Sequence, residues 1–353
     1  MKELQVALVG AGTISHCHMQ AYRKLPGVRV AAVCDINGER AKQFSQQYGI
    51  PNWYTNRRAM LEAECLDAVS AVTWNNAHGP VSIDALNAGV HVLCEKPLAL
   101  NAAEALEMQK AAEKSGRLLM PGFCTRYEEG AKLLKKMADG GELGTVYHVK
   151  ATFLRRCGNP GGWFADETRS GGGPVIDLGV HVLDLARYFT GMPRAVTVSA
   201  SVNRFIGSRP DVNVPGRYLS ADFAEYTNVE DSAMAFIRFD CGVSLAFETS
   251  WSHHVKEDAL QMELFGSRAG AVLYPHVEVY SDKLGYLSDT KSRHTNHEDN
   301  PNYDFDAEIA HFIGCVRGDE EPICTAEDGV EIMRIVDAIY ESARLKREVE
   351  VAR

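Results

Sequence analysis

The chain has 353 residues, which exceeds one average domain and predicts two. Hydrophobic residues make up 45% and charged residues 24%, as is typical of a soluble globular protein, and the net charge of −10 argues against nucleic acid or an anionic membrane surface as a partner. No apolar run is long enough to span a membrane, and the first strand pattern begins a few residues after Met1, so we expect a cytoplasmic protein without a signal peptide. None of the nine cysteines has a CxxC spacing, which predicts reduced thiols rather than a zinc knuckle or a dithiol redox site.

A glycine-rich turn near the N-terminus joins a short apolar run to a helix-like pattern. This order is typical of a buried parallel strand that feeds a helix whose N-terminus faces an anion. Gly10 would make the tight turn, Gly12 would let the backbone approach a pyrophosphate, and Ser15 is small enough for the third position of the dinucleotide fingerprint. The cofactor contacts expected in this turn are Gly10, Gly12, Thr13 and Ile14.

A second apolar run, over 28–34, ends in Asp35, about 20 residues past the fingerprint. An acidic side chain there can accept hydrogen bonds from the adenosine ribose hydroxyls and would repel the extra phosphate of NADP. The alternative is that Asp35 caps the next helix, which starts near Asn37. We predict dinucleotide binding, with NAD favoured over NADP although Arg40 lies nearby.

Strands and helices continue to alternate up to residue 123, which predicts a doubly wound parallel sheet, the Rossmann architecture. This first domain, 1–123, has strand patterns over 67–72, 91–94 and 118–123 and helix patterns over 13–25, 38–48, 80–88 and 101–115.

Residues 124–353 show a different pattern and are predicted to form a second, α+β domain. Several strands follow one another without intervening helices, which predicts a mostly antiparallel open sheet with helices on one face and solvent or a partner subunit on the other. Strands are expected over 146–153, 195–202, 233–239, 243–251, 260–265 and 271–273, and helices over 129–139, 174–189, 305–316 and 326–343. The stretches 205–228 and 281–302 have little pattern, and we expect loops there that are mobile or face the substrate.

Two polar stretches follow predicted strands of the first domain. The segment from Thr73 to His78 is expected to line the cofactor crevice, and an equally open alternative is a plain loop in which Asn75 or His78 caps the next helix. In Glu95-Lys96-Pro97, the proline restricts Lys96 to an extended conformation and allows a cis peptide. Such a lysine can stabilise a developing alkoxide or accept a proton, the alternative being a surface lysine at a turn.

A third stretch follows three consecutive glycines, Gly171–Gly173, which would allow the backbone to approach a ligand. Asp177 and His181 are four residues apart on the helix that follows, with Asp184 on the same side, so they predict a substrate-facing acid/base pair. A buried structural histidine is the alternative. A zinc site has two candidate ligands here but no third, and we predict no metal.

These motifs together resemble the glucose–fructose oxidoreductase/inositol dehydrogenase (Gfo/Idh/MocA) family over essentially the whole chain. The resemblance implies a nicotinamide cofactor and a sheet domain that forms homodimers or homotetramers. It also implies that the lysine of the Glu-Lys-Pro motif and the Asp and His of the helix act on a secondary alcohol, roles that map onto Lys96, Asp177 and His181. Arg126 and Tyr127 match the segment that enters the second domain near the cofactor. Trp74 stands where the family usually has Pro.

The expected function is therefore NAD-dependent hydride transfer between nicotinamide and a secondary alcohol of a sugar, glycoside or cyclitol. His181 would take the hydroxyl proton, Lys96 would stabilise the negative oxygen, and Asp177 would orient the histidine and a hydroxyl. Further cofactor contacts are expected from Asp35, Arg40, Thr73, Trp74, Asn75, His78, Glu95, Lys96, Pro97 and Arg126. Substrate contacts are expected from Lys96, Tyr127, Asn159, Trp163, Asp177 and His181, and loop anchoring is an equal alternative for Asn159 and Trp163.

Two other functions stay open at this point. One is an NAD-dependent glycosidase that uses transient oxidation, and the other is a cofactor-sensing regulator on the same scaffold. The regulator is disfavoured because a sensor needs no acid/base set.

Overall fold

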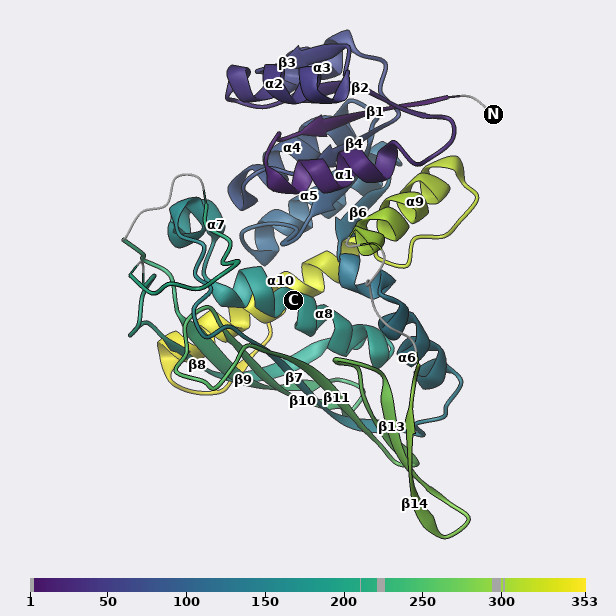
Figure 1. The fold of residues 1–353 in the computed structure, drawn as a ribbon, viewed down its shortest axis with the longest axis vertical. Coiled ribbons are helices and arrows are strands. Elements are labelled where there is room, and N and C mark those ends of the chain that lie inside the picture. The colour runs from purple at the N-terminus through teal and green to yellow at the C-terminus, as the bar shows by residue number, and fades with distance from the viewer. Residues whose placement is uncertain (1–2, 210, 221–225, 294–299, 301) are drawn as a thin grey trace. The chain divides into compact units, whose positions relative to one another are not determined.

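The computed structural model describes residues 3–209, 211–220, 226–293, 300 and 302–353 (Figure 1). The chain forms two compact units. The first comprises Met1–Tyr127 and Asp299–Val330, and the second comprises Glu128–Glu298 and Glu331–Arg353. In the described part of the chain, no helix is both long and apolar enough to cross a membrane. None of the nine cysteines forms a disulfide, although Cys65 and Cys241 are exposed rather than buried in the core.

The first unit contains a six-stranded parallel sheet in the order β3-β2-β1-β4-β5-β6, which confirms the predicted Rossmann architecture. Strand order reverses between β1 and β4, the position at which doubly wound sheets bind dinucleotides. The strands are β1 (Leu4–Val9), β2 (Val28–Cys34), β3 (Asn52–Tyr54), β4 (Ala68–Ala71), β5 (His91–Glu95) and β6 (Leu119–Gly122). The helices that accompany them are α1 (Thr13–Tyr22), α2 (Gly38–Tyr48), α3 (Arg57–Ala63), α4 (Asn75–Asn87) and α5 (Ala102–Ser115), with the short 3₁₀ turn η1 (Cys124–Tyr127) after β6.

Helix α9 (Tyr303–Arg317), from the C-terminal part of the chain, packs against α1 in this first unit. The Asn302 side chain donates to the carbonyl oxygen of Cys17 at 3.2 Å, and Lys24 lies 2.5 Å from Asp306. The division by compactness therefore differs from the predicted boundary after residue 123, because this returning helix joins the nucleotide-binding unit.

The second unit contains a nine-stranded sheet in the order β14-β13-β12-β11-β7-β10-β9-β8-β15. Only β7 and β10 pair in parallel among its described strands, so the mostly antiparallel prediction is confirmed. Figure 1 shows α6 and α8 on one face of this sheet. Its strands are β7 (Val146–Leu154), β8 (Ala195–Asn203), β9 (Ser232–Phe239), β10 (Ser244–Ser250), β11 (Ala259–Gly266), β12 (Ala269–Val272), β13 (Glu278–Lys283), β14 (Tyr286–Lys291) and β15 (Val349–Glu350). Its helical segments are α6 (Glu129–Asp139), η2 (Gly162–Ala165), α7 (Glu167–Ser170), the π turn η3 (Val175–Gly179), α8 (Val180–Phe189) and the end of α10 (Ala326–Leu345).

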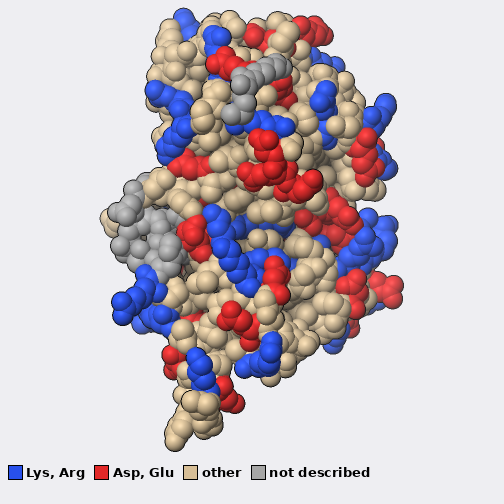
Figure 2. Space-filling view, turned by 90° about the vertical axis from the view of Figure 1, so that its right-hand side faces the viewer, with Lys and Arg blue, Asp and Glu red and all other residues tan. Residues whose placement is uncertain are grey.

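The β13–β14 hairpin lies where a loop over 281–302 was expected, and that expectation was wrong for the hairpin residues, while 294–299 and 301 lie outside the described residues. Both faces of the hairpin are largely exposed, so its sequence lacks the apolar alternation that marks a half-buried strand. Its tip is apolar, with Leu284 and Leu287 at least 90% exposed. In Figure 2 the tip is the uncharged projection at the bottom, whereas acidic and basic side chains are interspersed over the rest of the visible face.

Candidate active site

The glycine-rich turn after β1 has the geometry that the fingerprint predicts. Gly10 has φ +109°, and a Cβ there would lie 2.2 Å from the carbonyl oxygen of Val72, so no other residue fits. A Cβ on Gly12 would meet no heavy atom within 4 Å, which leaves open space beside the start of α1. The buried Ser15 hydroxyl donates to the carbonyl oxygen of Gly10 at 2.9 Å, and this hydrogen bond stabilises the turn. An open helix N-terminus without a side-chain cap suits a pyrophosphate.

Asp35 is tied to this turn rather than to the next helix. Its carboxylate accepts from the backbone N–H groups of Ala11 at 2.9 Å and Asn37 at 2.8 Å. Helix α2 is capped by Asn37, which accepts from the N–H of Arg40, so the alternative of Asp35 as the helix cap is wrong. The Arg40 guanidinium lies 3.8 Å from Asp35. Ile36, beside them, is 83% exposed and presents an apolar surface that the sequence analysis did not single out.

The segment after β4 belongs to helix α4, which starts at Asn75 rather than at residue 80. Trp74 is the N-cap and makes no side-chain cap bond, so neither Asn75 nor His78 caps this helix. The buried His78 donates through Nδ1 to the carbonyl oxygen of Pro97 at 2.7 Å, and its burial lowers its pKa. His78 thereby anchors the turn that carries Lys96.

The Lys96–Pro97 peptide is cis, the form that the sequence left open. Glu95 is buried and accepts from the Lys96 backbone N–H at 3.2 Å, while its other oxygen lies 3.0 Å from Nε2 of His18. Burial alone would raise the pKa of Glu95, but the hydrogen bond and charge of His18 lower it. Lys96 itself is partly exposed at the end of β5.

Arg126 and Tyr127 are both buried in the first unit, whereas the sequence analysis expected them to contact ligands. Arg126 donates to the carbonyl oxygen of Ile323 and lies 3.6 Å from Asp328, so the returning segment before α10 engages its guanidinium. Burial also raises the pKa of Tyr127. Arg126 thus has partners within the first unit, and contact of Arg126 or Tyr127 with a ligand stays a prediction.

In the second unit, Glu230 holds the glycine stretch that precedes Asp177. Its buried carboxylate accepts from the backbone N–H groups of Gly173 at 2.8 Å and Val175 at 3.0 Å, and from the Tyr340 hydroxyl at 3.0 Å. A Cβ on Gly172 would lie 2.0 Å from that hydroxyl, and a Cβ on Gly173 would lie 2.3 Å from the carbonyl oxygen of Glu230. These glycines therefore allow close packing against Tyr340 and Glu230, whereas the sequence had predicted that they allow the backbone to approach a ligand.

Asp177 lies in the π turn η3, where a continuous α-helix was expected. Within the described stretch Gly172–Arg187, Asp177 and His181 are the two residues that are half-buried rather than buried, and their facing a substrate stays a prediction. Asp184 is fully buried, and its expected place on that side was wrong. A π turn advances fewer degrees per residue than an α-helix, which breaks the seven-residue spacing that would stack Asp184 over Asp177. Such turns occur frequently at functional sites.

A buried tryptophan holds Asp177 in place. The Trp251 indole donates from Nε1 to Oδ2 of Asp177 at 2.9 Å, and the sequence analysis did not find this partner because it lies far along the chain. The Phe164 ring contacts Trp251 edge-on, and Trp163 stacks on Phe164 with ring centroids 3.8 Å apart. Asn159 is buried and accepts from the N–H of Gly161 at 2.9 Å, which favours the loop-anchoring alternative for this residue.

Comparison with known proteins finds similarity to one family of oxidoreductases along the chain. The family described as "Oxidoreductase family, NAD-binding Rossmann fold" matches residues 4–123, and the GFO/IDH/MocA C-terminal domain matches residues 131–272. The chain is 35% identical to D-glucoside 3-dehydrogenase of Escherichia coli over 99% of this chain and 97% of that protein. It is 28% identical to scyllo-inositol 2-dehydrogenase (NAD(+)) of Bacillus subtilis over 97% of this chain and 94% of that protein.

Among solved structures, an oxidoreductase domain protein from Kribbella flavida has a similar fold, with a TM-score of 0.88 and 25% identity over the full length of both chains. One family match falls in each unit, and the relative from Escherichia coli aligns over 99% of this chain. The chain belongs to the Gfo/Idh/MocA family of NAD-binding oxidoreductases.

Proposed function

We propose that this protein is an NAD-dependent dehydrogenase that oxidises a secondary alcohol of a sugar, glycoside or cyclitol. The observation that carries the proposal is that, within Gly172–Arg187, only Asp177 and His181 are partly exposed and all other residues are buried. A polar side chain in such a buried stretch is costly unless it is paired or acts on a ligand. The names of the full-length relatives, a glucoside dehydrogenase and an inositol dehydrogenase, supply the substrate class.

The residue roles follow from the chemistry of alcohol oxidation. His181 accepts the hydroxyl proton, the Lys96 ammonium stabilises the negative charge that develops on oxygen, and Asp177 orients a substrate hydroxyl and the imidazole. The glycine-rich turn and Asp35 would hold NAD, which would supply the hydride acceptor. Trp251 fixes one Asp177 oxygen from behind, and His78 and Glu95 hold the turn that presents Lys96.

The test is the formation of NADH from NAD with a panel of methyl glucosides, free sugars and inositols, followed by identification of the product. Oxidation at one ring carbon with NADH formed in equal amount supports the proposal. Release of free sugar from a glycoside without net NADH would overturn it in favour of the glycosidase alternative. Tight cofactor binding without turnover of any polyol would favour a regulator.

The reducing cytoplasm suits nine cysteines that form no disulfide, and we place the reaction there.

We infer from Asp35 that the cofactor is NAD rather than NADP. The further cofactor contacts are expected from the glycine-rich turn, Thr13, Ile14, Arg40 and the segment from Thr73 to His78. Asp35→Ala should raise KM for NAD about 10- to 100-fold, because a charged hydrogen-bond partner contributes about 1.5–3 kcal/mol. It should also lower the ratio of kcat/KM with NAD to kcat/KM with NADP, because the charge that repels the 2′-phosphate of NADP is removed. The measurement is initial-rate kinetics with both cofactors.

Two variants separate the charge from the structural role of Asp35. Asp35→Asn keeps one of the two acceptor oxygens that bond the N–H groups of Ala11 and Asn37 and removes the charge, so it should change the cofactor ratio with a smaller loss of stability than Asp35→Ala. Asp319→Ala, on an exposed carboxylate of the same unit, should leave both constants unchanged. An unaltered cofactor ratio in Asp35→Asn would contradict the assignment.

We also propose a homodimer or homotetramer that forms through the open face of the second-unit sheet. A hollow on that face is lined by Lys150, Met234, Phe236 and Glu248, and both Met234 and Phe236 are exposed. Light scattering should give two or four times the chain mass. Phe236→Asp should lower that mass because it places a charge in the buried patch, whereas Trp53→Asp, at an exposed apolar residue of β3, should not. A monomeric wild-type protein would refute the interface.

A further inference from the structure

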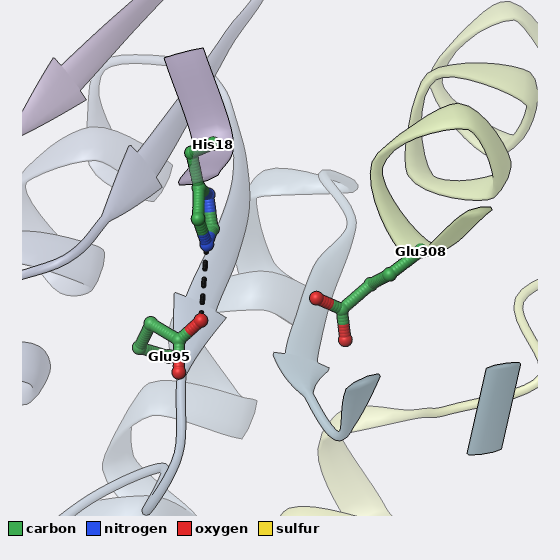
Figure 3. Close-up of side chains that lie close together, drawn as sticks. All are labelled: His18, Glu95 and Glu308. Atoms are coloured by element: carbon green, nitrogen blue, oxygen red, sulfur yellow. Dashed lines mark hydrogen bonds and ion pairs between the residues drawn. The ribbon is translucent and has the colours of Figure 1, made fainter. Parts of the chain in front are cut away.

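Three side chains from distant parts of the sequence meet inside the first unit (Figure 3). They are His18 in α1, Glu95 at the end of β5 and Glu308 in α9, and one ligand atom of each lies within 4.8 Å of the others. All three residues are buried. Their atoms, an imidazole nitrogen and two carboxylate oxygens, are the donor types that bind divalent transition cations.

The histidine already has the arrangement of a metal ligand. Its Nδ1 lies 3.0 Å from Oγ of Ser70, which is itself 2.8 Å from the Tyr22 hydroxyl. Its Nε2 lies 3.0 Å from Oε1 of Glu95 and donates to it when no cation is bound; with a cation, Nδ1 would keep its proton and donate to Ser70, and the lone pair of Nε2 would face the cation. Metal-bound histidines usually have their second ring nitrogen fixed in this way.

Glu308 is the unusual member of the cluster. It is fully buried, and neither of its carboxylate oxygens has a hydrogen-bond partner within the described residues. Figure 3 shows this carboxyl group pointing from α9 toward the His18–Glu95 pair. An unpartnered carboxylate in this setting is strongly unfavourable, which indicates that something else satisfies it.

The charges of the cluster do not balance by themselves. When both carboxylates are ionised they carry two negative charges, and His18 can supply at most one positive charge. A divalent cation with a neutral imidazole would balance both carboxylates.

We propose that His18, Glu95 and Glu308 form a structural site for one divalent transition cation, Zn²⁺ or Mn²⁺. The cation would join α1, β5 and the returning helix α9, and it would fix the carboxylate that accepts from the Lys96 backbone N–H. The sequence analysis predicted no metal, and the three residues have no short spacing that could have revealed this site.

The test measures metal content and stability and does not depend on catalytic activity, so it can fail while the proposed function holds. Because the site is buried, the full chain is unfolded in denaturant with a chelator and refolded with ZnCl₂, with MnCl₂ or with neither. We expect about one bound metal per chain by elemental analysis and a Tm several degrees higher with metal than without.

Glu308→Gln separates a bound cation from a bound proton, because the two predict opposite changes. If a cation binds, the amide is a poor ligand, so metal content and Tm both fall. If Glu308 instead holds a proton, the amide replaces a neutral acid, and Tm stays the same or rises. Glu107→Gln, at an exposed glutamate of α5, is the matched control and should bind metal as the wild type does. Wild-type protein refolded without bound Zn²⁺ or Mn²⁺, and a Tm that does not fall in Glu308→Gln, would overturn the site.

Discussion

Replacing His181 by alanine should lower kcat for alcohol oxidation about 10²- to 10⁴-fold, the contribution of a placed general base. The loss arises because no other group would accept the hydroxyl proton as hydride leaves. Affinity for NAD should stay unchanged, because the expected cofactor contacts belong to the first unit. The measurements are single-turnover formation of NADH and a separate titration of NAD binding by protein fluorescence.

Lys96→Ala should also reduce turnover strongly, because the negative charge on the substrate oxygen would lose its cation. His148→Ala is the matched control for the histidine. The His148 ring is hydrogen-bonded to Oγ of Ser244 on one face of the sheet. Phe247, whose ring lies against Gly179 of the π turn, is on the opposite face. His148→Ala should therefore leave kcat unchanged. Turnover that survived both His181→Ala and Lys96→Ala would show that the assigned roles are wrong.

The first unit was largely predictable because its strands are apolar runs and its helices carry explicit end signals. Asn101 accepts from the N–H of Glu104 at the start of α5, and Gly49 ends α2 in the left-handed conformation, as their positions in the sequence indicate. Strand β3 was missed because its three residues lie at the sheet edge with little burial. Helix α4 was predicted too short because Pro80, expected in the first turn, lies inside the helix.

The parts of the site that depend on distant partners could not be read from local pattern. The π turn at Asp177 has the composition of an ordinary helix start, so the sequence singled out the half-buried Asp177 and His181 but did not predict the burial of Asp184. Trp251 reaches Asp177 from 74 positions away, and Glu230 reaches Gly173 from 57 positions away. Such contacts follow from the fold and carry no signal in spacing or periodicity.

Replacing Glu230 by alanine should cost about 3 kcal/mol or more of unfolding free energy, since it leaves three buried donors without their acceptor at about 1–3 kcal/mol each. These donors are the N–H groups of Gly173 and Val175 and the hydroxyl of Tyr340. Urea unfolding gives the free energy. The exposed Glu350→Ala should change it by less than about 0.5 kcal/mol.

Glu230→Gln distinguishes lost hydrogen bonds from lost charge, because its amide oxygen can still accept from the backbone. Burial raises the pKa of Glu230 while the backbone N–H bonds oppose that shift, so the neutral amide removes the cost of burying a charge and keeps part of the bonding. We expect Glu230→Gln to retain most of the stability but to lower kcat, because its NH₂ group faces donors at the segment that leads into Asp177. If Glu230→Ala unfolded at the same urea concentration as the wild type, or if Glu230→Gln kept full kcat, the carboxylate would not be what holds the glycine stretch in position for catalysis.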